Sequence, residues 1–356
     1  MSVIRTKEEQ GRPKRSTDHF FELLDHYRQL VLARICELVP QNRYRSTLYE
    51  PMLEYPLREG KGFRPALCLA VCQACGGRVE EALDTAVALE MFHNAFLLHD
   101  DVEDRSEERR GQPTLHQKYG IAIAINVGDA LNMLAMRTLL GNTRSLGLER
   151  ALTLIFEVDR MARESAEGQS IELDWVRFNR ANTSVRDYLR MSQKKTCWYT
   201  CITPMRSGAL IAKVSDERLN PFIPFGLKIG AAFQIQDDVL NLTAEQSLYG
   251  KELHGDIGEG KHTVMAIHLM REAKGHDAAK IADIYGRRRE DKTADDVDFV
   301  FRCMEQYGSL DFARDLARRL TLSAARTFSR RFGWMPPSPY RRFLEEMIDY
   351  MIERKL

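Results

Sequence analysis

The sequence lacks the features that would place the protein in a membrane or on nucleic acid. Its 356 residues contain no apolar run long enough to cross a bilayer, and the first residues lack the apolar stretch of a signal peptide. The 52 lysines and arginines nearly balance the 51 aspartates and glutamates, so the formal charge of +1 gives no electrostatic reason to expect a nucleic-acid partner. We therefore expect a cytoplasmic protein without stable membrane insertion.

Cysteine is too scarce for a disulfide-rich protein. Seven cysteines in a chain of this length, an odd number, fit a reducing compartment. Cys68, Cys72 and Cys75 have helical spacing, but no fourth cysteine or histidine lies nearby to complete a tetrahedral zinc site. We therefore expect these three cysteines to be free and buried.

The alternating apolar and polar runs that are typical of β-strands are also missing. Apolar residues instead recur at helical spacing between short breaks, which lie at 60–65, 76–77, 141–147, 275 and 336–339. We predict an all-α protein, a bundle of long antiparallel helices around a central cavity. The polar, basic residues 1–16 are expected to form a disordered lead-in, and residues 17–356 a single domain.

An apolar stretch from Leu89 to Leu98 leads directly into three acids. Its apolar residues are too dense for a surface helix, so we expect a helix that is buried on most sides and delivers its acids into an interior. Asp100, Asp101 and Asp104 have spacings of one, three and four residues and are expected on one helix face. Carboxylates that repel one another are tolerated there only if cations neutralise them, and hard oxygen ligands of this kind suit Mg²⁺.

A second apolar helix, predicted over residues 225–242, also ends in acids. Asp237 and Asp238 stand near its end as Asp100 and Asp101 stand near the end of the first. Two such helices facing each other would surround divalent cations, and a diphosphate would complete the cluster. The alternative is that each acidic pair is a solvated helix end, but the repetition of the pattern favours a metal site.

Basic residues near these acids indicate an anionic ligand. Lys61 and Arg64 lie on a glycine-containing loop before a predicted helix, where backbone N–H groups and the helix dipole favour anions. Arg109 and Arg110 follow the first acids, and their guanidinium groups match phosphate oxygens. Weaker candidates for binding the same anionic ligand are Lys195, Thr196, Lys251 and Lys261, with Asp256 between the last two.

The pattern alone does not assign a function to His93 or to three arginine clusters, and their interpretations follow from their positions. His93 lies two helical turns, about 10 Å, before Asp100 on nearly the same face, and a core histidine is the alternative to a ligand-binding one. The arginine clusters at 287–289, 318–319 and 330–331 are interpreted as solvated faces.

Six ordered motifs, beginning after about residue 18, resemble those of the trans-isoprenyl diphosphate synthase (polyprenyl synthetase) family. Their pattern is most similar to that of bacterial geranylgeranyl diphosphate synthases. They lie in the segments GKGFRP, HDDVEDRSEERRGQPTLH, MSQKKT, FQIQDDVLN and GKELHGDIGEGKHT. Gly62 and Phe63 depart from the family's usual basic residues. In EGQSIELDW, Gln169 and Glu172 resemble the family's Gln-x-x-Asp, with Glu in place of Asp, and are expected near the site.

The resemblance implies an isoprenoid synthase fold and a Mg²⁺-dependent, head-to-tail condensation of isopentenyl diphosphate with an allylic prenyl diphosphate. It also implies a homodimer. The acids implied to bind the metal are Asp100, Asp101, Asp104, Asp237 and Asp238, which with Lys195 form the catalytic set. The residues implied to bind the allylic diphosphate are Arg109, Lys195, Thr196, Gln234, Lys251 and Lys261. Those implied to bind isopentenyl diphosphate are Lys61, Arg64, His93 and Arg110.

Product length in this family depends on side chains one or two helical turns below the first acids. Here these residues are Phe92, Ala95 and Phe96. Farnesyl-producing enzymes often have a ring at the position of Ala95, so the resemblance favours geranylgeranyl diphosphate, with farnesyl or longer products as alternatives.

Two further alternatives remain at this stage. Asp237, Asn241 and Glu245 recur every four residues and approach the second metal motif of class I terpene cyclases. A cyclase handles one diphosphate, however, and has no need for the separate set around Lys61 and Arg64. Asn241 is left out of the metal ligands because its amide oxygen is neutral. A noncatalytic subunit of a heteromeric synthase would be expected to have lost its acidic motifs, and both remain largely intact.

Overall fold

The computed structural model describes residues 18–58, 60–180, 182–244 and 254–353, with side chains described up to 351. The predicted lead-in at 1–16 lies outside the described residues. In the first half, the helices are α1 Asp18–Leu38, α2 Glu50–Leu57, α3 Phe63–Ala74, α4 Val79–Glu103, α5 Leu115–Tyr119, α6 Ile121–Leu146 and α7 Leu148–Phe178, and a π-helical segment, η1, covers Arg45–Tyr49.

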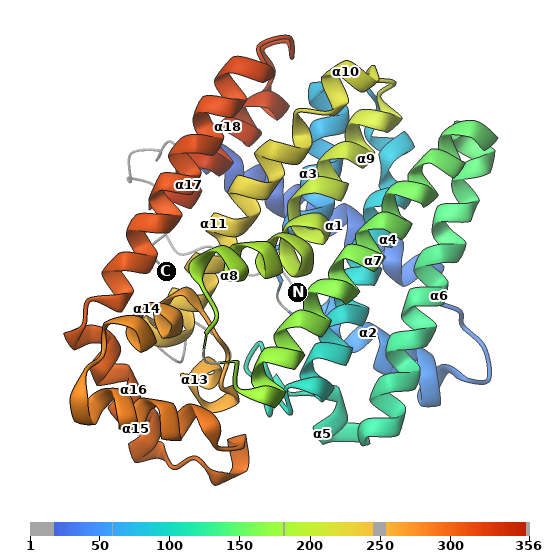
Figure 1. Cartoon of the computed structure of the whole chain (residues 1–356). Coiled ribbons are helices and arrows are strands. Elements are labelled where there is room, and N and C mark those ends of the chain that lie inside the picture. The colour runs from blue at the N-terminus through green and yellow to red at the C-terminus, as the bar shows by residue number, and fades with distance from the viewer. Residues whose placement is uncertain (1–17, 59, 181, 245–253, 354–356) are drawn as a thin grey trace, which may run out of the picture.

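The remaining elements complete an all-α chain, which confirms the predicted fold class (Figure 1). They are α8 Val185–Ser192, the π-helix η2 Gln193–Ile202, α9 Thr203–Ile211, α10 Asp216–Leu219, α11 Phe222–Thr243, α13 Gly255–Glu259, α14 Val264–Glu272, α15 Gly275–Gly286, the 3₁₀ segment η3 Arg289–Asp291, α16 Ala294–Gln306, α17 Ser309–Arg331 and α18 Pro339–Glu353. None of the helices formed by the described residues is long and apolar enough to cross a membrane.

Helix α4 lies inside the bundle, between α3 and α6 (Figure 1). Its apolar residues are fully or largely buried through most of its length, from Ala82 to Leu98. This burial confirms the expectation of a helix enclosed on most sides. It also carries the acids at the end of α4 into the interior of the protein.

Apolar side chains form two clusters. The larger one joins α1, α3, α4, α6, α9 and α18, and the smaller one joins α8 with α14, α15 and α16. Helices α11 and α17 contribute to both, because the earlier part of α11 packs in the larger cluster and its end packs in the smaller one. These two helices therefore connect the two clusters, and a single domain over residues 17–356 stays a prediction.

The π-helix η2 is held between α7 and α11 by glycines. A Cβ atom added to Gly168 of α7 would lie 2.1 Å from the backbone nitrogen of Lys195, and one added to Gly230 of α11 would lie 3.0 Å from the Cα of Cys197. Both distances are too short for a side chain, so the backbones meet directly. A π-helical segment is rare and is often found at functional sites, and this one carries Lys195 and Thr196.

A small hairpin is the only β-structure among the described residues, and the sequence analysis did not predict it. Its strands, β1 Glu108–Arg109 and β2 Gln112–Pro113, pair antiparallel. The two turn residues, Arg110 and Gly111, both have positive φ, of 54° and 69°. This combination is typical of the type I′ turn that joins the tightest hairpins.

The cysteines follow the prediction. Cys68, Cys72 and Cys75 are all free, with the first two buried and the third partly buried. Burial raises the pKa of each of these thiols, to about 12 for Cys72 and Cys75, so none of them is poised for metal binding or nucleophilic chemistry.

Candidate active site

Two adjoining cavities lie where α4, α11 and η2 meet. The main cavity, of about 280 Å³, is lined by polar and charged residues from segments far apart in the sequence, among them Asp100, Lys195, Gln234, Asp237, Asp238, Asp256 and Lys261. The second, of about 80 Å³, is lined by Lys61, Arg64, Glu90, His93, Arg110 and Tyr350. Arg64, His93, Arg110 and Phe233 line both cavities, so a ligand in one would lie close to a ligand in the other.

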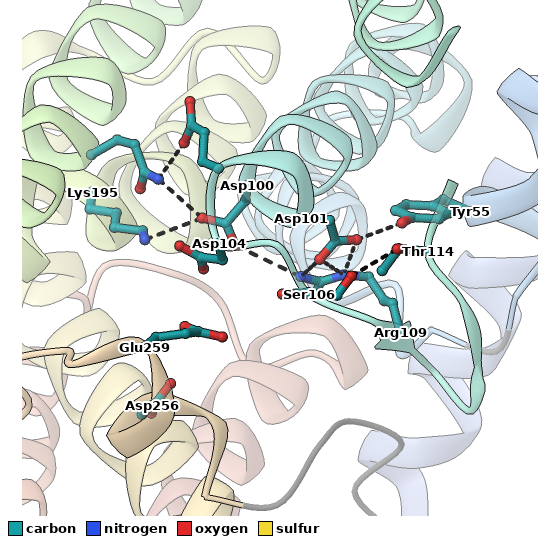
Figure 2. A network of polar contacts seen from close by, with 12 residues as sticks. Tyr55, Asp100, Asp101, Asp104, Ser106, Arg109, Thr114, Lys195, Asp256 and Glu259 are labelled. Carbon is teal, nitrogen blue, oxygen red and sulfur yellow. Dashed lines mark hydrogen bonds and ion pairs between the residues drawn. The ribbon is translucent and has the colours of Figure 1, made fainter. Parts of the chain in front are cut away.

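Lysines from distant elements neutralise two of the three acids at the end of α4. The Lys195 ammonium lies 3.3 Å from Asp100 (Figure 2), and the Lys261 ammonium lies 2.6 Å from Asp104. Lys195 also pairs with Glu172, and Lys261 pairs with Glu259. Burial opposes the charge of each lysine, but the surrounding carboxylates outweigh it and raise both pKa values above the usual range. Both ammonium groups therefore stay charged at neutral pH.

Asp101 does not share a face with Asp100 and Asp104, which differs from the expectation. It is 1% exposed and accepts hydrogen bonds from the Arg109 Nε, at 2.8 and 2.7 Å, and from the Tyr55 hydroxyl (Figure 2). The reason is helical geometry, because successive residues turn by about 100° around a helix of 3.6 residues per turn. Asp100 lines the main cavity and Asp104 pairs with Lys261 at its edge, whereas Asp101 points toward the hairpin.

The second acidic pair, Asp237 and Asp238, lines the main cavity from α11. Asp238 is buried and accepts hydrogen bonds from the Tyr188 hydroxyl at 2.7 Å and from the Gln234 Nε2 at 2.8 Å. Burial, reinforced by the charge of Asp256, raises the pKa of Asp238 well above its usual value. Gln234 also accepts a hydrogen bond from Thr196 at 2.7 Å, which links η2 to α11.

The acids alone do not enclose a cation. Among the residues that the structure describes, no three carboxylate, imidazole or thiol groups come together closely enough to hold a metal ion. The donors that line the main cavity are nevertheless hard carboxylate oxygens, which fit Mg²⁺ when phosphate oxygens of a substrate complete its coordination.

The second cavity brings together the residues expected to bind isopentenyl diphosphate. The Arg64 guanidinium lies 3.2 Å from the His93 Nε2, donates to the Thr200 hydroxyl at 2.9 Å and stacks on the Tyr199 ring, 4.5 Å from its centre. Lys61 donates to the Tyr350 hydroxyl at 3.1 Å, so α18 covers this cavity. His93 thus lines both cavities, and its role in binding a ligand stays a prediction.

Gly62 and Asn241 depart from the family pattern for local reasons. Gly62 is the N-cap of α3 with φ of 60°, a backbone conformation that favours glycine, and its missing side chain leaves room for Arg28. The Asn241 amide oxygen accepts from the Asp256 N–H at 3.2 Å. Asn241 therefore links α11 to the start of α13.

Gln169 and Glu172 lie at the site as expected, and Lys251 cannot be placed. Gln169 donates to Asp100 at 3.3 Å and to Glu103 at 2.5 Å, and Glu172 pairs with Lys195. Lys251 lies outside the described residues.

Three residues of the site were missed by the sequence analysis. Arg289, interpreted as part of a solvated cluster, is only 22% exposed and donates to the Asp104 carbonyl at 3.0 Å and to Glu259 at 2.8 Å, so that interpretation was wrong for this arginine. The place of Glu259 inside the Asp-x-x-x-Gly-Lys motif could have indicated it. Glu90 is an acid in a cationic cavity, and burial raises its pKa against the opposing effect of Arg64 and Arg110.

The residues expected to set product length lie below the acids. Ala95 is fully buried and Phe92 nearly so, while Phe96 is partly buried. The Phe96 ring packs edge-on against Tyr199, with 5.7 Å between ring centres, and Tyr199 lines the main cavity. Phe96 thus contacts a residue of the cavity wall, and its role in product length stays a prediction.

Known proteins that are similar to this chain in sequence or in structure are prenyl diphosphate synthases. A family model described as polyprenyl synthetase matches residues 46–304. A geranylgeranyl diphosphate synthase of Methanosarcina mazei is 32% identical, covering 91% of this chain and 95% of that protein, and a geranylfarnesyl diphosphate synthase of Natronomonas pharaonis is 28% identical, covering 95% and 99%. The crystal structure of a polyprenyl synthase from Caulobacter crescentus, complexed with calcium and isoprenyl diphosphate, has a TM-score of 0.85 at 26% identity and covers 97% of this chain and 100% of that one.

The different surroundings of Asp100 and Asp101 predict different effects on stability. Asp101→Asn removes the close counter-charge of the buried Arg109 guanidinium and leaves only a longer contact with Asp100, at 3.8 Å, so we expect a loss of about 3–5 kcal/mol in the free energy of unfolding. Asp100→Asn, at a partly exposed ion pair, should cost about 1 kcal/mol or less. Urea unfolding of both variants measures the difference, and equal losses would contradict the assigned contacts.

Proposed function

The chain belongs to the polyprenyl synthetase family and is a prenyltransferase, and on that premise we propose that it condenses isopentenyl diphosphate with an allylic prenyl diphosphate to give geranylgeranyl diphosphate. The observation that carries this proposal is the pair of adjoining cavities, each lined by cationic side chains. The main cavity is also lined by several acids from different helices, whereas Glu90 is the one acid among the lining residues of the second cavity. One cavity therefore suits a diphosphate that must ionise, and the other a diphosphate that is only held.

A divalent cation fits the main cavity in this scheme. Asp100, Asp237 and Asp238, which line this cavity, and Asp104 at its edge would hold Mg²⁺ together with oxygens of the allylic diphosphate. The metal supplies positive charge where negative charge develops on the leaving diphosphate. Since its carboxylate is occupied by Arg109 and Tyr55, we assign Asp101 to positioning Arg109 and not to direct metal binding.

The protein's own cations act on the same leaving group. When the C–O bond of the allylic substrate breaks, its electron pair stays on the diphosphate, and the charged Lys195 and Lys261 side chains stabilise it there. The double bond of isopentenyl diphosphate then attacks the allylic carbon, and the departed diphosphate accepts the proton that is lost. Tyr199 and Phe96 line the path of the hydrocarbon and exclude water, which would quench the cation.

The product proposal rests on the space below the acids and on the relatives. Ala95 leaves the position five residues before Asp100 small, and the Methanosarcina mazei relative is a geranylgeranyl diphosphate synthase. The Natronomonas pharaonis relative is a geranylfarnesyl diphosphate synthase, so geranylfarnesyl diphosphate is the longer alternative for the product of this chain.

We also propose a homodimer formed through α6 and α7. These neighbouring helices expose large apolar side chains to solvent, and together they make the densest such group in the described chain: Ile121, Ile123, Ile125, Met133, Leu140, Leu148, Leu152 and Phe156. Phe156 is 70% exposed and Met133 69%, values unusual for a monomer surface.

Product analysis tests the function directly. We expect the protein, given Mg²⁺, isopentenyl diphosphate and dimethylallyl, geranyl and farnesyl diphosphates as competing starters, to release a C20 diphosphate, detected by mass spectrometry. Asp100→Ala should abolish turnover with the fold intact by circular dichroism. Release of a cyclic hydrocarbon from one prenyl diphosphate would indicate a cyclase instead, and activity only with a partner protein would indicate a heteromeric subunit.

Phe96 tests the control of product length. Its ring lies one helical turn, about 6 Å, below Asp100, and Phe96→Ala removes an obstacle to the growing chain. We expect products longer by at least one C5 unit, measured by mass spectrometry. Phe178→Ala, which removes a surface ring that is 56% exposed, is the control and should leave the product unchanged. An unchanged distribution in Phe96→Ala would show that the chain follows another path.

The dimer proposal predicts the effect of one charge on α7. Phe156→Asp places a carboxylate in the apolar face, and we expect the protein to sediment as a monomer, whereas the unmodified chain sediments as a dimer. Circular dichroism of the variant controls for folding. A monomeric unmodified protein at micromolar concentration would overturn the proposal.

A further inference from the structure

The hairpin that carries Arg109 and Arg110 is too small to hold its own shape. Each strand has two residues, and strands of this length gain little stability from their own pairing. Arg110 additionally holds φ of 54°, which is unfavourable for a side chain other than glycine. Contacts with the rest of the protein must therefore stabilise the turn.

Arg58 supplies these contacts from the end of α2. Its guanidinium donates to the Arg109 carbonyl at 3.2 Å, on the first strand, and to the Pro113 carbonyl at 2.8 Å, on the second. The side chain is only 4% exposed, stacks on the Tyr55 ring at 4.6 Å and is neutralised by Glu54 at 3.2 Å. One buried guanidinium thus bridges both strands of the hairpin.

The same short segment contacts the side chain of each motif arginine. Arg110 donates to the Tyr55 and Arg58 carbonyls, at 3.0 and 3.3 Å, and so caps the C-terminal end of α2. The Tyr55 hydroxyl donates to Asp101, which in turn binds Arg109 (Figure 2). Arg58 itself lines neither cavity, so it acts only through its neighbours.

We propose that Arg58 is a positioning residue that fixes Arg109 and Arg110 relative to each other and so sets the spacing between the two diphosphate positions. The inference rests on the proposed function for the identity of the ligands. Its physical basis is that a buried guanidinium shared between two carbonyls leaves both strands unsatisfied when it is removed, which is costly in a site of low dielectric constant. The geometry of the hairpin then depends on one side chain outside the family's motifs.

The experiment compares Arg58→Met, which keeps the length of the side chain without its donors, with Arg58→Lys and with Arg45→Met. Arg45 is the matched control because it lies beside α2 and pairs with Glu50 at the surface, where it is 60% exposed. Two readouts need no catalysis. They are hydrogen exchange at the amides of Thr114 and Leu115, which bond to the Glu107 carbonyl and the Tyr55 hydroxyl, and calorimetric binding of inorganic pyrophosphate with Mg²⁺.

In Arg58→Met we expect both amides to exchange about tenfold faster or more, and pyrophosphate to bind about tenfold more weakly, the effect of losing roughly one charge-assisted hydrogen bond. The KM for isopentenyl diphosphate should rise by a similar factor. Arg58→Lys should recover part of each change, because an ammonium reaches one carbonyl at a time, and Arg45→Met should match the unmodified protein.

Unchanged amide exchange in Arg58→Met would overturn the structural part of the inference. Faster exchange with unchanged pyrophosphate affinity and KM would show that the arginines do not depend on the hairpin, and would overturn the positioning role. Failure of the unmodified protein to use isopentenyl diphosphate would count against the proposed function alone, since exchange and pyrophosphate binding do not require turnover.

Discussion

The ion pairs between the acids at the end of α4 and two lysines from distant segments are the interaction on which the site depends. Asp100 and Asp104 are held close together in a partly closed cavity, where two like charges are unfavourable without compensation. Lys195 from η2 and Lys261 from the segment after α13 provide that compensation. Because each lysine has a second carboxylate partner, Glu172 or Glu259, it can give up its aspartate to a metal and remain a cation beside the leaving group.

The scaffold explains how these charges reach one place. The apolar helix α4 brings the acids inside, and the contact of Gly168 with η2 brings Lys195 up to them. The hairpin after α4 turns back and places Arg109 against Asp101, with Arg110 over the second cavity. Residues that never touch a ligand, such as Gly168 and Arg58, therefore set the geometry as firmly as the charged motifs do.

Much of this arrangement could be predicted from the sequence, and the failures have physical causes. The all-α class, the buried α4 and the grouping of Asp100, Lys195 and Lys261 follow from apolar spacing and ordered motifs. The orientation of the buried Asp101 side chain toward the hairpin was missed because sequence spacing was read as one face, whereas a step of one residue rotates a side chain far around the helix. The hairpin was not predicted because two-residue strands have no periodic pattern. The contacts of Arg289 were not predicted because its partners are distant in the sequence.

Helix α7 connects the surface of the protein with its chemistry. Phe156 projects from its outer side, and twelve residues later, about 18 Å along the helix, Gly168 presses directly on the backbone of Lys195. No flexible side chain lies at that contact to absorb a displacement. A displacement of α7 would therefore be transmitted to the backbone of Lys195. A partner that packs against Phe156 would thus also restrict the position of this lysine.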